Sequence, residues 1–286
     1  MSYLRFSRRR ILPLALVLSG AACSQGATAS PPVQDSGAWF EEDWEAYADR
    51  AELAGTYHVG LSGAGADGDV AVVTGLTGTP GGFTRAVEVR FHDISAARSC
   101  GYEPGAGVVV PLPDAARDRP DELWLEVPIY LAPGYTTNHG CNAFSEHKFL
   151  FLFDQRGDNG RWNVMMGSAG SELRVYPNAD PGGVLVARVP GTDPSSFDSP
   201  RLDIDSELVG TWSTMRLRTR LGPDGTGLSQ LWIDGVMVLD DRGLSTDPGS
   251  QYFQRISLGA NMNQRPASPV MWRYGPLKVY IEDPGW

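Results

Sequence analysis

The sequence has 286 residues and 42% hydrophobic residues, enough for one large domain or two small ones. Its formal charge of −10 argues against general nucleic-acid binding, which requires a basic surface to contact phosphates. We therefore expect no nucleic-acid partner.

The first 22 residues have the layout of a bacterial secretory signal. Four arginines between positions 5 and 10 precede an apolar run at 11–18, and small residues lead to Cys23. The run is too short to span a bilayer as a helix, which needs about 20 residues. Residues 7–12 also resemble the twin-arginine export motif, so both export routes stay open. We expect an exported protein, and removal of the signal would change its charge from −10 to −14.

Residues 18–23 resemble a bacterial lipoprotein cleavage site in which Cys23 becomes the lipidated first residue. Gly20 departs from that pattern, and ordinary cleavage after Ala22 or Ala29 is the alternative. Residues 23–38 are small, polar and proline-bearing, as in a flexible tether. We expect a lipid anchor as the only membrane contact, a periplasmic or cell-surface location, and a single domain at 39–286.

Two further cysteines, Cys100 and Cys141, remain in an oxidising compartment, which favours a disulfide between them. The bridge would close a loop of about 40 residues and stabilise the fold by about 3 to 4 kcal/mol. Two separated cysteines cannot form a zinc motif.

Glu- and Ala-rich residues 40–53 form the one stretch that predicts a helix. Period-two alternation then predicts strands at 85–92 and 123–131. The second strand has leucine, valine and isoleucine on one face, and Trp124, Glu126 and Tyr130 on the other.

Further strands follow up to the end of the chain. The run 149–153 suits a central strand buried on both faces, and 178–205 is a long irregular segment with four prolines. Asp234-Gly235 between apolar runs predicts a type I′ hairpin. The remaining expected strands are 161–166, 172–176, 212–221, 253–259 and 270–281.

About a dozen short strands without intervening helices predict an all-β fold of two packed antiparallel sheets, a sandwich or jelly roll. The missing helices exclude a βαβ architecture. No fixed-period repeat is visible, which argues against a propeller.

Two motifs resemble concanavalin A-like jelly rolls. Residues 231–236, LWIDGV, follow a strand opened by Trp212, and 274–280, YGPLKVY, is similar to the closing strand of bacterial polysaccharide-lyase-like members. The paired blocks 122–131 and 147–151 are similar to the same group, so the resemblance covers about 83–286. It implies a two-sheet antiparallel jelly-roll sandwich and one of three functions, namely glycoside hydrolase, polysaccharide lyase or non-catalytic glycan binding.

No complete catalytic set is visible. A retaining glycosidase needs two carboxylates about 5 Å apart, and the nearest string is Asp203, Asp205 and Glu207, which is also typical of a solvated turn. Alginate-lyase-like members carry Q-I-H and Y-x-K-x-G-x-Y strands, which this sequence lacks; Tyr252-Phe253-Gln254-Arg255 begins like the second and diverges. The catalytic residues are therefore left unassigned.

Candidate glycan-binding residues follow from strand alternation. Aromatic rings stack on sugar faces and arginine pairs with carboxylates, although a solvated outer face is the alternative. A loop held by the expected disulfide supplies two more candidates, which a simple turn would also explain. The full set is Arg90, His92, Trp124, Glu126, Tyr130, Tyr135 and His139.

Other polar groups have simpler interpretations. Arg216, Arg218 and Arg220 form a stripe that could meet an anionic polymer or mark a solvent face. His147 suits a buried core-edge position. We expect no cofactor or metal, with structural calcium at Asp154, Asp158 and Asn159 as the alternative.

The sequence therefore predicts an exported glycan-binding jelly roll whose partner is a polysaccharide and which acts as a monomer. One alternative is a lyase that cleaves a uronate polymer by β-elimination. The other is a structural surface lipoprotein.

Overall fold

The computed structural model of the chain describes residues 37–60, 68–93, 105–137, 146–156, 162–177, 179–180, 185–196, 198–259, 262–263 and 268–286. The expected signal, residues 23–36 of the expected tether, Cys100, His139 and Cys141 lie outside these ranges and stay predictions. Ser36–Trp286 form one compact unit. Within the described ranges, no helix has both the length and the apolar character needed to cross a membrane.

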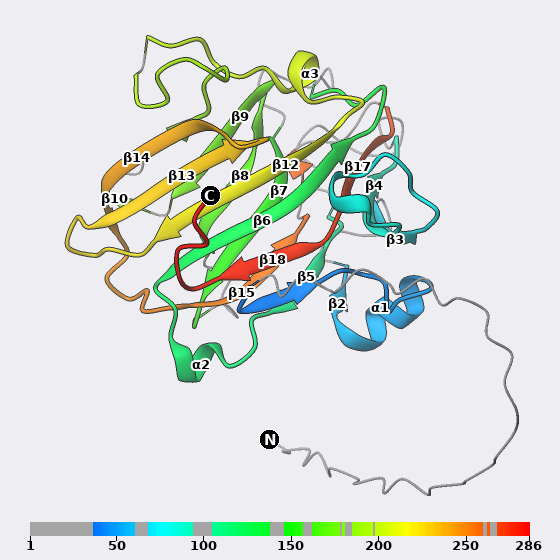
Figure 1. Ribbon diagram of the computed structural model, residues 1–286, viewed down its shortest axis with the longest axis horizontal. Helices are drawn as coiled ribbons and strands as arrows, with labels where there is room; N and C mark the ends of the chain where they lie inside the picture. The colour runs from blue at the N-terminus through cyan, green and yellow to red at the C-terminus, as the bar shows by residue number, and fades with distance from the viewer. Residues whose placement is uncertain are drawn as a thin grey trace, which may run out of the picture. The chain divides into compact units, whose positions relative to one another are not determined.

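Two antiparallel sheets overlie one another (Figure 1). The ten-stranded sheet has the order β10 (Ala179–Asp180), β14 (Val236–Thr246), β13 (Gly227–Ile233), β12 (Trp212–Arg220), β6 (Glu122–Leu131), β17 (Val270–Tyr274), β4 (Ala86–Phe91), β3 (Gly68–Val73), with β18 (Leu277–Tyr280) beside β6 and β1 (Phe40–Glu42) beside β18.

The eight-stranded sheet forms the second layer. Its order is β11 (Leu185–Val186), β9 (Glu172–Pro177), β8 (Trp162–Ala169), β7 (Glu146–Asp154), β15 (Phe253–Leu258), β5 (Val108–Pro111), β2 (His58–Val59), and β16 (Met262–Asn263) pairs with β7. Helical turns are short: α1 (Arg50–Thr56), α2 (Ala115–Asp118), α3 (Ile204–Glu207) and the 3-10 turn η1 (Pro80–Gly82).

The core lies between the two sheets and follows the period-two pattern. On β6, Leu125, Val127 and Ile129 are at most 2% exposed, and the residues between them point to the other side of the sheet. Fully burying one such side chain contributes about 1.5–3 kcal/mol. Alternation therefore fixes which face of β6 is covered and which face carries polar groups.

The Asp234-Gly235 hairpin is confirmed. Both residues have positive φ, 50° and 81°, as a type I′ turn requires. The Asp234 carboxylate also accepts a hydrogen bond from the Thr214 backbone at 2.7 Å, which ties the turn to β12.

The helix expected at 40–53 is wrong over its first part. Phe40–Glu42 form β1 and pair with β18, with Glu41 opposite Lys278. The helix begins at Arg50, and the side chain of Asp49 accepts hydrogen bonds from the backbone amides of Ala51 and Glu52. Long-range strand pairing overrides the local helical composition of residues 40–42.

Candidate functional site

The outer face of the ten-stranded sheet carries the polar and aromatic residues that alternate with the core. On β6 these are Glu122, Trp124, Glu126 and Tyr130. The same strand therefore presents a carboxylate or an aromatic ring at nearly every outward position.

The arginine stripe on β12 faces these glutamates across the strand pair. Arg216 lies 2.7 Å from Glu126, and Arg218 lies 2.6 Å from Glu122, with Nε as the donor in both pairs. Arg220 is 3.7 Å from Glu122. The stripe is thus neutralised within the sheet instead of forming a free positive surface.

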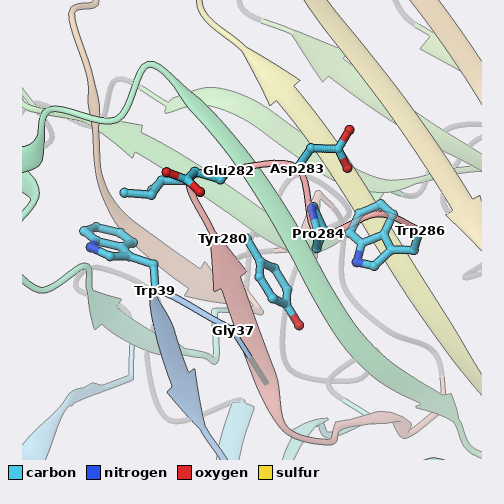
Figure 2. A pocket seen from close by; sticks show the side chains of 8 residues that line it. Gly37, Trp39, Tyr280, Glu282, Asp283, Pro284 and Trp286 are labelled. Carbon is cyan, nitrogen blue, oxygen red and sulfur yellow. The ribbon is translucent and has the colours of Figure 1, made fainter. Parts of the chain in front are cut away.

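A pocket of about 340 Å³ lies at one end of this face; we call it the tryptophan pocket. Figure 2 shows Trp39 on one side of Tyr280, and Pro284 and Trp286 on the other. Glu282 and Asp283 add two exposed carboxylates. The full lining is Gly37, Trp39, Tyr280, Ile281, Glu282, Asp283, Pro284 and Trp286.

Trp286 connects this pocket to the strands beneath it. Its ring meets those of Trp124 and Trp232 edge-on, at centroid distances of 5.1 and 5.2 Å. The guanidinium of Arg216 lies 5.0 Å from the same ring, and Arg218 lies 4.2 Å from the ring of Trp124. Aromatic rings and guanidinium groups therefore alternate over this end of the sheet.

A second pocket, of about 420 Å³, adjoins the first along β18; we call it the acidic pocket. Arg216 lines it and also contacts Trp286 of the tryptophan pocket, so this arginine lies between the two pockets. Lys278 pairs with Glu41 at 3.8 Å across its floor. The full lining is Glu41, Asp43, Glu45, Pro80, Gly81, Gly82, Phe83, Glu126, Pro128, Thr214, Arg216, Pro276 and Lys278.

A second aromatic cluster closes the far end of the acidic pocket. Phe83 lies edge-on to Trp212 at 5.0 Å, and Tyr130 lies 5.4 Å from Trp212. Gly275 makes this packing possible, because a Cβ there would lie 2.6 Å from Phe83 Cζ. From Tyr130 to Trp124 the chain advances six residues, or roughly 20 Å at about 3.3 Å per residue.

The Tyr280 phenol has a raised pKa and therefore keeps the proton that it needs to donate a hydrogen bond. Burial raises the pKa of its phenol above the ordinary value, and the nearby carboxylates of Glu126 and Glu41 raise it further. The group stays protonated at neutral pH. The pockets thus offer stacking surfaces, hydroxyl groups and carboxylate acceptors.

The sequence-predicted candidates divide into two groups on this face. Trp124, Glu126 and Tyr130 lie along the two pockets, although Trp124 is only 5% exposed under Trp286. Arg90 and His92 are exposed on the same side, two strands away on β4 and just beyond it. Arg90 pairs with Glu88 at 2.6 Å. These two residues lie beyond the Tyr130 end and do not line either pocket.

Tyr135 does not reach this surface. It is 5% exposed, and its hydroxyl contacts Nδ1 of the fully buried His147. The His147 ring stacks on Trp272 in the core. His147 is therefore a buried histidine, and Tyr135 is its partner and not an accessible binding group.

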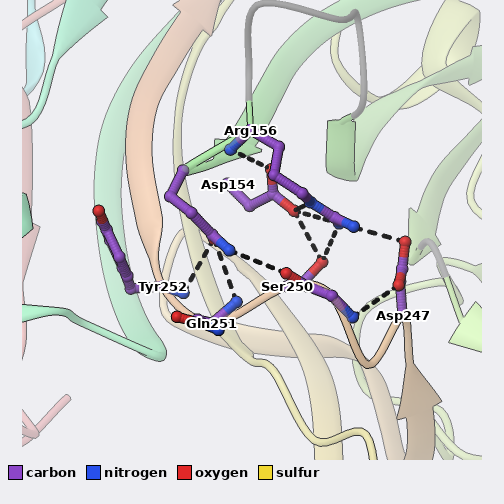
Figure 3. A network of polar contacts seen from close by, with 8 residues as sticks. Asp154, Arg156, Asp247, Ser250, Gln251 and Tyr252 are labelled. Carbon is purple, nitrogen blue, oxygen red and sulfur yellow. Dashed lines mark hydrogen bonds and ion pairs between the residues drawn. The ribbon is translucent and has the colours of Figure 1, made fainter.

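The acidic strings singled out in the sequence have structural partners. Asp203 caps α3 by accepting from the backbone of Asp205 at 2.9 Å. Asp154 is fully buried and bonded to Arg156, which also reaches Asp247 at 3.1 Å (Figure 3). Ser250 donates to Asp154 at 2.8 Å.

Calcium at this loop stays a prediction. Asp158 and Asn159, the other two residues named for it, lie outside the described ranges. Within those ranges no group of three or more His, Cys, Asp or Glu could hold a metal ion.

A third pocket, of about 490 Å³, lies at the edges of the two sheets beside β11 and β14. Two of the three arginines in its lining, Arg201 and Arg242, pair with Glu172 and Asp240 at 2.5 and 2.9 Å. None of its described lining residues is aromatic. It therefore lacks the stacking surfaces found on the outer face.

Sequence reasoning missed most of the aromatic lining. The position of Trp232 could have been predicted, because period-two alternation in the LWIDG strand places it on the outer face together with Gln230. No local sequence pattern predicts the positions of Trp39, Phe83 and Trp286, because only long-range packing brings them to β6 and β18.

Comparison with known proteins gives a result only at the level of structure. A scan against protein-family models gives no match, and neither does a search of curated proteins. The chain is similar to the solved structure of an endo-β-1,4-glucuronan lyase from the fungus Trichoderma reesei. The TM-score is 0.56 at 12% identity, and the match covers 85% of this chain and 95% of that one.

Two further solved structures match with lower TM-scores. The cellulose-induced protein Cip1 gives 0.49 at 12% identity over 85% of this chain and 97% of that one. The alginate lyase Aly36B gives 0.40 at 12% identity over 68% and 80%. From its topology and its likeness to the glucuronan lyase, the chain has the fold of a two-sheet antiparallel jelly-roll sandwich, as the sequence predicted.

Proposed function

We propose that the protein is an exported polysaccharide-binding protein that holds a glycan chain along the outer face of its ten-stranded sheet. One observation carries the proposal. Two adjoining pockets follow β18 and β6, and aromatic clusters stand at both ends of the row.

The chemistry of this row suits an extended chain of sugar rings. Aromatic faces stack on the C–H faces of sugars, and carboxylates accept hydrogen bonds from sugar hydroxyl groups. The separation of roughly 20 Å between Tyr130 and Trp124, at about 3.3 Å per residue, is long enough for several linked rings. A polymer, and not a single small metabolite, would use both ends together.

The fold and the N-terminal sequence support the same proposal. The glucuronan lyase of similar fold acts on a polysaccharide. The arginines and apolar run before Cys23 favour export, where envelope and environmental glycans are met. The proposal includes a lipid anchor at Cys23 and a monomeric state.

A polysaccharide lyase is the second candidate, favoured by the likeness to the glucuronan lyase over 95% of that chain. Such an enzyme needs a cation for the uronate carboxylate, and a base and an acid for the elimination. The arginines of β12 are already bound to glutamates. Of the described histidines, His147 is buried, and neither His58 nor His92 lines the two pockets. Binding is therefore the function that the described residues support best.

Retention on immobilised polysaccharides tests the proposal. The protein should be retained by at least one polymer of a mixed neutral and acidic panel, and Trp286→Ala should weaken that retention. Tyr252→Ala, which removes a partly buried aromatic residue outside both pockets, is the matched control and should leave it unchanged.

Cleavage of the polysaccharide is measured in the same samples. The ultraviolet absorbance of an unsaturated product would establish the lyase instead. Absence of both retention and turnover on every polymer would contradict both functions.

A further inference from the structure

The charges around the two pockets distinguish between classes of glycan. The tryptophan pocket has two carboxylates, Glu282 and Asp283, and no basic residue in its lining. The acidic pocket has four carboxylates against Arg216 and Lys278. Each pocket thus carries an excess of two negative charges.

Each of the two cations already has an acidic partner. Arg216 is bound to Glu126 at 2.7 Å and lies over the Trp286 ring, and Lys278 faces Glu41 at 3.8 Å. Glu45 has a cation partner outside the pocket lining, Arg85, at 3.5 Å. After these pairs are made, Asp43, Glu282 and Asp283 remain as acidic groups without a cation in either lining.

An incoming carboxylate would face these groups across a few ångströms. Like charges repel, and because Asp43, Glu282 and Asp283 are exposed, water and salt weaken this repulsion without removing it. A neutral hydroxymethyl group at the same position would instead donate a hydrogen bond to a carboxylate oxygen. The same pocket therefore penalises a uronate and favours an uncharged sugar.

We propose that the outer-face site binds a polysaccharide of neutral sugars and discriminates against uronate polymers. This inference rests on the proposed function. It also separates the chain from the glucuronan lyase whose fold it shares, because that enzyme acts on a chain with a carboxylate on every ring. The two proteins would share a fold and prefer ligands of different charge, neutral for this chain and anionic for the glucuronan lyase.

A matched pair of ligands measures the effect of the ligand's carboxylate charge on affinity. Soluble β-1,4-glucan and β-1,4-glucuronan oligomers of equal length have the same backbone and differ only in a hydroxymethyl or a carboxylate group on each ring. Calorimetric titration at low salt should give at least tenfold tighter binding of neutral oligomers. Xylan and mannan oligomers extend the neutral set if glucan does not fit.

A double variant tests whether the carboxylates cause the preference. Glu282→Gln with Asp283→Asn should increase glucuronan affinity at least fivefold and leave neutral binding nearly unchanged. The control changes two exposed carboxylates outside both pockets, Asp198→Asn with Glu207→Gln, and should alter neither affinity. Added salt should narrow the difference, because it screens the repulsion.

The outcomes separate the two proposals. Equal or tighter glucuronan binding at this site would overturn the charge inference and leave polysaccharide binding in place. Binding of no oligomer in either class would remove the proposed function itself.

Discussion

Replacement of Trp286 by alanine should weaken glycan binding with only a small effect on folding. The ring makes two edge-on contacts, each about 0.5–1.5 kcal/mol, and one cation–π contact of about 0.5–1 kcal/mol. Its Nε1 is buried, and no described residue accepts from it, which costs about 1–3 kcal/mol. These terms nearly cancel, so the free energy of unfolding should fall by about 0–2 kcal/mol.

The effect on binding should be larger. If stacking on a sugar ring resembles base–aromatic stacking, its loss costs about 1–3 kcal/mol, which corresponds to a roughly 5- to 150-fold increase in Kd. Calorimetry with a retained oligosaccharide measures this change, and urea unfolding measures stability.

The variant Trp286→Phe distinguishes the contribution of the aromatic ring from that of the indole N–H group. It keeps an aromatic surface and removes the buried donor, so binding should be largely preserved and stability equal or higher. Unchanged affinity in Trp286→Ala would refute the stacking argument.

Three predictions concern the fold. Asp154→Asn should lower the free energy of unfolding, measured in urea, by about 3 kcal/mol. This is the low end of the range for a broken buried ion pair, because Arg156 keeps its second partner, Asp247. An unchanged free energy of unfolding would contradict a stabilising role for the Asp154–Arg156 pair shown in Figure 3. Burial alone would raise the pKa values of Asp154 and Glu172, but hydrogen bonds from arginines hold both below their ordinary range. Stability from these groups should therefore be complete above their unfolded pKa values of about 4 and decline as pH falls toward the folded values, and acid titration of Asp154→Asn should show a smaller decline. Gly235→Ala should cost about 1 kcal/mol by thermal unfolding, because φ there is 81°; an unchanged midpoint would argue against the type I′ turn.

Local patterns were sufficient to predict the two-sheet fold. Alternation along 123–131 and the Asp234-Gly235 turn are short-range signals, and both correspond to observed elements. The strand Phe40–Glu42 was missed because its partner, β18, is more than 200 residues away in sequence. Its pairing depends on tertiary context that no local window contains.

The candidate site was predicted only in part, for a similar reason. Period two placed Trp124, Glu126 and Tyr130 on one face, and the structure agrees. It could not show that Trp286 covers Trp124, or that the hydroxyl of Tyr135 contacts a buried histidine. Such contacts depend on where a loop or a tail packs.

The most direct test of the central claim is a titration of the indole N–H signals by two-dimensional NMR with a bound oligosaccharide. If the glycan lies on the outer face, the signals of Trp39, Trp124 and Trp286 should shift together. Those of Trp44 and Trp272 should stay fixed, because both are fully buried and hydrogen-bonded in the core. Glycan binding that leaves the signals of Trp39, Trp124 and Trp286 unchanged would place the site elsewhere and contradict the account.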